Sequence, residues 1–273
     1  MIKTLTRNRR QFGYAVSIAL GFMLLQQLYA SEQLIVSVVA SVVLWLVLML
    51  ELFTDYFFSR KLLKQLGLPS VTDYSKPTQV IYHALLPSLL FLALVGLIYT
   101  TNVSYLAPVY FIVALGTFSL LFINIRAYYE DKYKLEGNTH IVYDLIKIII
   151  FFSFTQFVLT LSDSLSFNFF VQVGIVFVIG SLLSMLVLVR SRLNSWLFLS
   201  MIVLSGLAIG YLTASLNTYL NISNLLASFM STVVFYIFNA ILHHEKQRTL
   251  TAQIVAEYIL VAALCLLIVL LLN

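Results

Sequence analysis

The chain has 273 residues, of which 61% are hydrophobic and 10% are charged, and its mean hydropathy is +0.99. Soluble domains carry roughly 25% charged residues, so this composition has too little polar surface for one. The formal net charge of +5 does not indicate nucleic-acid binding, because the basic residues lie in short segments between apolar runs. We expect an all-α integral membrane protein whose surroundings are the lipid bilayer, with no soluble domain.

Nine apolar runs are long enough, or nearly so, to cross a hydrocarbon core of about 30 Å. They cover residues 12–30, 34–56, 79–99, 106–125, 141–161, 168–189, 196–214, 222–242 and 252–272. The first run, with its basic start, also resembles a signal peptide. The residues around Ala30 make a poor cleavage site, so the run is predicted to remain as a span. We therefore expect one polytopic domain, a bundle of about nine transmembrane helices covering residues 1–273.

The basic residues predict the orientation of these spans. All but one of the 16 Lys and Arg residues precede the first run or follow the second, fourth, sixth or eighth. The other connections contain no Lys or Arg, and their only charges are Glu32 and Asp163. By the positive-inside rule the N-terminus is cytoplasmic and the C-terminus lies on the outer side, most simply of the plasma membrane. The remaining basic residue, Lys147, lies inside the fifth run.

Charged groups within spans are costly and often functional. Glu51 lies in the second span, which leaves into the cytoplasm, so its side chain should lean toward the bilayer centre. Asp55 lies one turn later on the same face and has the same sign of charge. Glu51 is therefore predicted either to be protonated or to pair with another helix, where Lys147 and His83 are candidate partners.

The other ionisable groups lie in spans that enter from the cytoplasm, so their side chains lean toward cytoplasmic water. Asp144 and Lys147 share one helix face with His140. This stripe is either a self-paired, snorkelling group at the membrane interface or the lining of a water-filled cavity. Glu257 has no basic residue one turn away, and it is either an interface carboxylate or a group that must be protonated or find a partner on another helix.

Several uncharged residues are predicted to shape the bundle. The amides Gln156, Gln172, Asn124 and Asn239 are typical of hydrogen bonds between packed helices. Pro87 is predicted to kink the third span. Two glycine pairs allow close helix approach: Gly174 with Gly180, and Gly206 with Gly210, of which only the second has the small-xxx-small spacing.

The sequence contains no catalytic or metal-binding motif, so no catalytic residue, metal ligand or cofactor is assigned. Adjacent His243 and His244 point about 100° apart on a helix, which is poor metal geometry. The favoured hypothesis is transport of a small solute or ion through a cytoplasm-facing polar cavity. Its predicted lining is Glu51, Asp55, His83, Asp144, Lys147 and Glu257. The alternatives are a non-catalytic membrane assembly protein and, less favoured, a lipid-modifying membrane enzyme. No oligomeric state is predicted.

Overall fold

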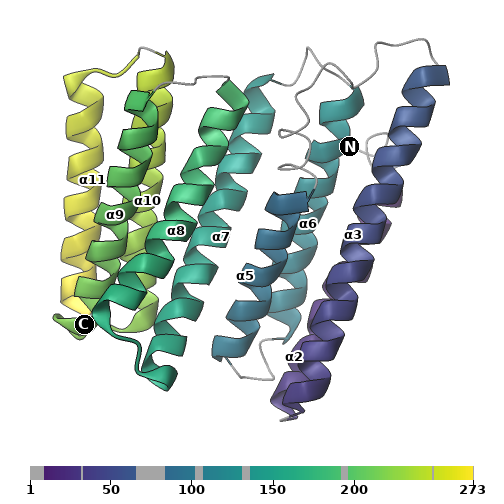
Figure 1. Cartoon of the computed structure of the whole chain (residues 1–273), viewed down its shortest axis with the longest axis horizontal. Coiled ribbons are helices and arrows are strands. Elements are labelled where there is room, and N and C mark those ends of the chain that lie inside the picture. Colours follow the sequence, from purple (N-terminus) through teal and green to yellow (C-terminus); the bar gives the residue numbers. More distant parts are fainter. Residues whose placement is uncertain are drawn as a thin grey trace. The chain divides into compact units, whose positions relative to one another are not determined.

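The structure is a computed structural model of the chain. It describes residues 9–31, 33–65, 84–101, 107–130, 136–191, 196–247 and 249–272. These residues form nine α-helices and contain no strand. The helices are α2 (Arg9–Ala30), α3 (Leu34–Gln65), α5 (Leu86–Thr101), α6 (Ala107–Glu130), α7 (Glu136–Leu165), α8 (Phe169–Ser191), α9 (Trp196–Thr218), α10 (Asn224–Gln247) and α11 (Ala252–Leu272). Figure 1 shows them coloured along the chain.

One helix lies on each predicted apolar run, which confirms the all-α class. Six helices are long and apolar enough to cross a membrane: α2, α3, α7, α9, α10 and α11. The apolar parts of α5, α6 and α8 are shorter, at 10–17 residues. The prediction of nine spans and of their orientation therefore stays a prediction, while the membrane-spanning character of the chain rests on the six longer helices.

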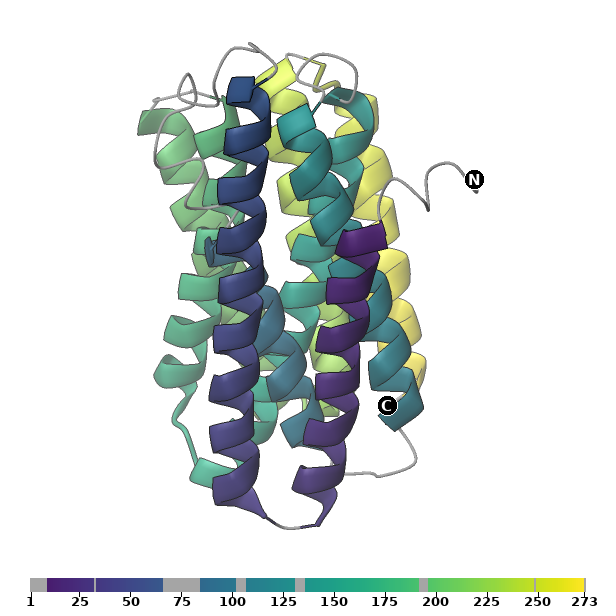
Figure 2. The ribbon, with the colours of Figure 1, turned by 90° about the vertical axis from the view of Figure 1, so that its right-hand side faces the viewer.

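The chain divides into two compact units, Met1–Ile146 and Lys147–Asn273, and the boundary falls within α7. In the N-terminal unit, α2 packs against α6 and runs beside α3 (Figures 1 and 2). Its core is aromatic: the ring of Phe22 lies 5.1 Å from that of Phe91 and 6.0 Å from that of Phe118. Trp45 Nε1 donates a hydrogen bond to Ser88 Oγ at 3.1 Å and so joins α3 to α5.

Pro87 lies in the first turn of α5, directly after a short π-helical turn at residues 84–85. Proline has no N–H to donate, and the first turn of a helix tolerates it because the N–H groups there have no partner within the helix. The predicted kink of the third span at Pro87 stays a prediction. The segment before it, which includes His83, lies outside the described residues.

In the C-terminal unit the most extensive helix contact is between α8 and α9. Gly206 and Gly210, on α9, allow the two helices to approach closely. A Cβ atom at Gly210 would lie 2.7 Å from the backbone oxygen of Val173, and one at Gly206 would collide with Ser181 Oγ. This confirms the close approach predicted from the small-xxx-small spacing. The prediction was wrong for Gly174, where a Cβ would meet nothing within 4 Å.

The core of the C-terminal unit is apolar where α7 meets α10, and the rings of Phe151 and Phe235 stack at 4.3 Å. A second apolar cluster joins α7, α9, α10 and α11 and includes Leu159, Leu216, Met230 and Val269. By contrast, α11 and the membrane-spanning part of α3 are mostly exposed. Since these faces are strongly apolar, lipid or another protein must cover them in the membrane.

Candidate functional site

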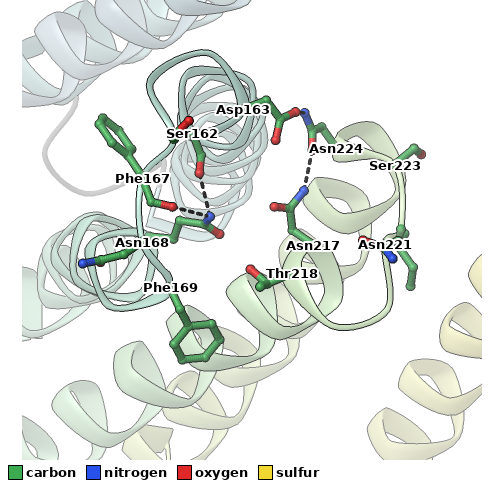
Figure 3. Close-up of a pocket in the computed structure, with 13 residues that line it drawn as sticks. Ser162, Asp163, Phe167, Asn168, Phe169, Asn217, Thr218, Asn221, Ser223 and Asn224 are labelled. Carbon is green, nitrogen blue, oxygen red and sulfur yellow. Dashed lines mark hydrogen bonds between the residues drawn. The ribbon is translucent and has the colours of Figure 1, made fainter.

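A polar pocket lies in the C-terminal unit, where α7 and α9 end and α8 and α10 begin (Figure 3). Its volume is about 680 Å³ and it opens widely to the surface. It is lined by Ser162, Asp163, Ser166, Phe167, Asn168, Phe169, Gln172, Asn217, Thr218, Asn221, Ile222, Ser223 and Asn224. Most of these side chains carry hydrogen-bonding groups, which sets the pocket apart from the apolar helices around it.

The α7–α8 connection forms one side of the pocket through two local signals. Ser166 follows the last residue of α7 with φ of 53°, in the left-handed region, and the N–H of Phe167 donates back to the Ser162 carbonyl at 3.1 Å. This is the Schellman ending of a helix, which normally prefers glycine at the left-handed position. Asn168 then caps α8, because its Oδ1 accepts a hydrogen bond from the N–H of Val171 at 2.9 Å.

The α9–α10 connection forms the other side in a similar way. Asn221 also has a positive φ, of 49°, which asparagine tolerates better than most residues. The N–H of Ile222 donates to the carbonyl of Leu216 at 3.1 Å and closes the end of α9. Two tight connections thus place their asparagine, serine and aspartate side chains around one opening.

Three side chains form a hydrogen-bonded chain across the pocket. Asn217 Nδ2 donates to Asn224 Oδ1 at 2.6 Å, and Asn224 Nδ2 donates to Asp163 Oδ2 at 2.6 Å. They come from the end of α9, the start of α10 and the end of α7. In Figure 3 the oxygen of Asn217 and the second carboxylate oxygen of Asp163 both point toward the interior of the pocket. The chain therefore ties three helices together and still presents unused acceptors.

Gln172, on the first turn of α8, and Ser162 are the most buried polar residues of the pocket, each with 4% of its surface exposed. Gln172 Nε2 donates to Ser162 Oγ at 2.6 Å and lies 3.5 Å from the carbonyl oxygen of Phe167. Its Oε1 has no hydrogen-bond partner among the described residues. A buried acceptor without a partner costs about 1–3 kcal/mol, so this oxygen is an unusual feature within a packed helix.

Polar groups continue from the pocket toward the middle of the unit. Ser228 Oγ donates to Gln156 Oε1 at 3.2 Å, between α10 and α7. Thr213 Oγ1 and Ser231 Oγ hydrogen-bond at 2.8 Å, between α9 and α10. These residues lie one to two helical turns from the pocket, and their partners confirm the prediction that Gln156 bonds across helices.

The rings of Phe167 and Phe169 border the pocket but turn away from its polar centre (Figure 3). Phe169 instead packs against aromatic residues of α9 and the connection that follows it. Its ring centroid lies 5.4 Å from those of both Tyr211 and Tyr219. The aromatic groups therefore hold α8 against α9, and the centre of the pocket belongs to amide, hydroxyl and carboxylate oxygens.

The residues predicted to line a cytoplasm-facing cavity are distributed over both units. Glu51, in the N-terminal unit, is half-buried, and its Oε2 is buried with no hydrogen-bond partner among the described residues. Asp55 lies on α3, but its side chain is outside the described set, as is all of His83. Their predicted convergence with Asp144, Lys147 and Glu257 stays a prediction.

Asp144 and Lys147 remain one turn apart on α7. Lys147 is only 5% exposed, and the choice between a snorkelling stripe and the lining of a cavity stays a prediction. Glu257 is exposed on α11 and accepts a hydrogen bond from Gln253 Nε2 at 3.2 Å, one turn earlier on the same helix. Glu257 therefore has a hydrogen-bond partner within α11 itself.

Sequence reasoning missed the pocket itself. Asp163 was noted only as a charge in an outer connection, and Gln172 only as a packing group. The sequence does contain a signal: the connections "SDSLSFN" (162–168) and "NTYLNISN" (217–224) are both rich in small amide and hydroxyl residues and lie on the same predicted side. What the sequence does not contain is the pairing of these two connections, which depends on α8 and α9 packing closely.

The apolar helices and the polar pocket at their ends define an all-helical integral membrane protein. Residues 60–272 match the model of the DUF5656 family, which is described as a protein of unknown function, and the chain belongs to this family. No curated protein matches the chain, and no solved structure does. The match covers the whole of the C-terminal unit except its last residue, and so includes every residue of the pocket.

Proposed function

We propose that this protein transports a small solute, neutral or positively charged, and that the solute binds in the polar pocket of the C-terminal unit. The observation that carries the proposal is the pocket itself: about 680 Å³ of space lined mainly by polar side chains at the ends of apolar helices. Small-molecule sites typically measure about 300–1,000 Å³ and present a few placed polar groups.

The polar groups beyond the pocket support transport rather than binding alone. The pairs Gln156–Ser228 and Thr213–Ser231 offer hydroxyl and amide groups along the inner faces of α7, α9 and α10. Polar groups inside membrane helices face the bundle interior and often mark a solute path. Under this proposal the pocket is the outer entrance. The predicted set of Glu51, Asp55, His83, Asp144, Lys147 and Glu257 serves the cytoplasmic side.

Assembly with another membrane protein is the second candidate function. It is favoured by α11, whose apolar side chains are mostly exposed and whose Glu257 lies on an exposed face. Exposed carboxylates among apolar residues suit a helix–helix interface as well as the lipid headgroups. A protein of this kind would need no solute, and the pocket would then be a structural feature of its outer surface.

Uptake into proteoliposomes distinguishes transport from assembly with another membrane protein. The purified protein is reconstituted, and entry of labelled ethanolamine, 1,4-diaminobutane, glycine and glucose is measured against protein-free liposomes. Transport predicts saturable entry of at least one solute, lost in Asp163→Asn and retained in Leu260→Ala on the exposed face of α11. Entry of all four solutes at the background rate, with a stoichiometric membrane partner lost in Glu257→Ala, would instead establish the assembly function.

A further inference from the structure

We propose that the pocket recognises a primary ammonium group, which is held by the open acceptors of Asp163 and Asn217 beside the buried amide of Gln172. This inference rests on the proposed function and names the chemical class of the solute. It follows from the direction of each hydrogen bond in the pocket, from the charge of the lining residues and from the burial of one unpartnered acceptor. Each of these is independent of the others.

The direction of the first hydrogen-bonded chain is set by Asp163, because a carboxylate can only accept. Asn224 must therefore turn its NH₂ group toward Asp163 and its oxygen toward Asn217. Asn217 must in turn give its NH₂ group to Asn224. This leaves the oxygen of Asn217 and the second oxygen of Asp163 as acceptors that point into the pocket (Figure 3).

The direction of Gln172 is set by the carbonyl oxygen of Phe167, which also can only accept. The NH₂ group of Gln172 faces that carbonyl and Ser162, so its oxygen lies on the other side. With 4% of the side chain exposed, bulk water does little to satisfy this oxygen. The pocket thus presents two open oxygen acceptors, on Asn217 and Asp163, and Gln172 adds a buried acceptor within its wall, so a ligand that fills the pocket must bring donors.

The charge of the lining restricts the ligand further. Asp163 is the one ionisable side chain among the thirteen lining residues, and no Lys, Arg or His is among them. An anionic ligand would therefore meet a negative charge and no positive one. An ammonium group carries N–H donors and a positive charge, which match two open acceptors of which one is a carboxylate.

The size of the pocket favours an organic amine over a bare metal ion. About 680 Å³ is far more than one cation occupies, and the acceptors lie on its walls. A primary ammonium group can come from a free solute or from an aminophospholipid headgroup, since the pocket lies at the ends of membrane helices. The two sources share one chemistry, and competition by phosphatidylethanolamine in the nanodisc distinguishes them.

Binding is measured directly with the full chain in nanodiscs of phosphatidylcholine, using labelled ethanolamine and 1,4-diaminobutane as probes. Choline is the matched control, because it keeps the positive charge but has no N–H donor. Ethylene glycol keeps donors but has no charge. We expect saturable binding of the primary amines and at least about tenfold weaker binding of both controls.

Two substitutions place this binding in the pocket. Asp163→Asn keeps an acceptor for Asn224 but removes the charge, and Gln172→Met keeps the length of the side chain but removes the amide, with both its oxygen and its donor to Ser162. Each should weaken ethanolamine binding about tenfold or more. The control Glu245→Gln, near the other end of α10, removes a carboxylate outside the pocket and should bind as the wild type does.

Several results would overturn the inference: equal affinity for choline, tight binding that Na⁺ or Ca²⁺ abolishes by competition, no binding of either amine at millimolar concentration, or unchanged affinity in both Asp163→Asn and Gln172→Met. Displacement of the amine by phosphatidylethanolamine in the nanodisc identifies a lipid headgroup as the source of the ammonium group.

The same measurements separate this inference from the proposed transport function. Binding of an amine without uptake would support this inference and contradict transport. Uptake of glucose alone would support transport and would overturn the inference that the pocket recognises an ammonium group.

Discussion

The amide of Asn224 donates a 2.6 Å hydrogen bond to the carboxylate of Asp163, and the two residues are 61 positions apart in the chain. The bond joins the start of α10 to the end of α7 at the edge of the pocket. We expect it to contribute to stability as well as to the shape of the site. A double-mutant cycle of Asp163→Ala and Asn224→Ala should give a coupling energy of about 1–2 kcal/mol in detergent unfolding. Additive effects of the two substitutions would show that the contact contributes nothing to the free energy of unfolding.

The close packing of α8 on α9 predicts a sharp difference between two glycines. Gly210→Ala should lower the melting temperature, because the new methyl group would lie 2.7 Å from the backbone oxygen of Val173. Separation of the helices would cost about 1–3 kcal/mol. Gly174→Ala is the matched control on α8. Its methyl group meets nothing within 4 Å, and alanine is the better helix former by up to about 1 kcal/mol. Equal destabilisation by both substitutions would contradict the packing described for this pair.

The left-handed Ser166 predicts a stabilising substitution. Ser166→Gly should raise the free energy of unfolding by about 0.5–1 kcal/mol, since glycine adopts this conformation without strain. Thermal unfolding of the purified protein measures the effect. Ser164→Gly, two residues earlier inside α7, is the control and should destabilise by about the same amount. A loss of stability in Ser166→Gly would mean that α7 does not end in this conformation.

Glu51 offers a test of the N-terminal unit in transport. One of its carboxylate oxygens is buried without a hydrogen-bond partner among the described residues, inside a strongly apolar helix. Glu51→Gln keeps the shape of the side chain and removes its ability to carry a charge or a proton. We expect it to abolish uptake that depends on a proton or cation gradient in proteoliposomes, while Glu245→Gln retains it. Unchanged uptake would remove Glu51 from the mechanism.

Cysteine labelling tests the predicted orientation of the pocket. The chain has a single cysteine, Cys265, so Cys265→Ser provides a background free of thiols. In that background, Ser164→Cys should react with a membrane-impermeant maleimide in intact cells. Thr249→Cys, in the α10–α11 connection, should react only after permeabilisation. Both positions are exposed, so accessibility within the protein does not limit the reaction. The reverse pattern would place the pocket on the cytoplasmic side.

The helices of this protein were largely predictable from its sequence, whereas its site was not. Apolar runs define helices because every backbone group must be hydrogen-bonded within the membrane, and the described helices lie on the nine predicted runs. The spacing of Gly206 and Gly210 also predicted a close contact correctly. These features are local, and local sequence is enough to specify them.

The site depends on contacts between distant segments, which a single sequence does not display. Glu51, Lys147 and Glu257 stand out in the sequence as candidate site residues, because charges inside membrane spans are rare. The pocket is built mainly from uncharged amides and hydroxyls, and its one carboxylate, Asp163, lies next to a short connection where a charge is common. Only the pairing of the two connections shows that Asp163 and Asn224 meet.

The tight contact of α8 with α9 bears on how the pocket could open. Interlocked backbones leave these two helices little freedom to slide, so they should move as one body. The contact of α10 with α8 is much smaller, and α10 reaches α7 at the pocket through the hydrogen bond from Asn224 to Asp163. Below the pocket, the stacked rings of Phe151 and Phe235 and the bond from Ser228 to Gln156 also hold α10 to α7. A solute that draws on Asp163 would therefore loosen only the outer ends of these two helices, while α8 and α9 stay fixed to each other.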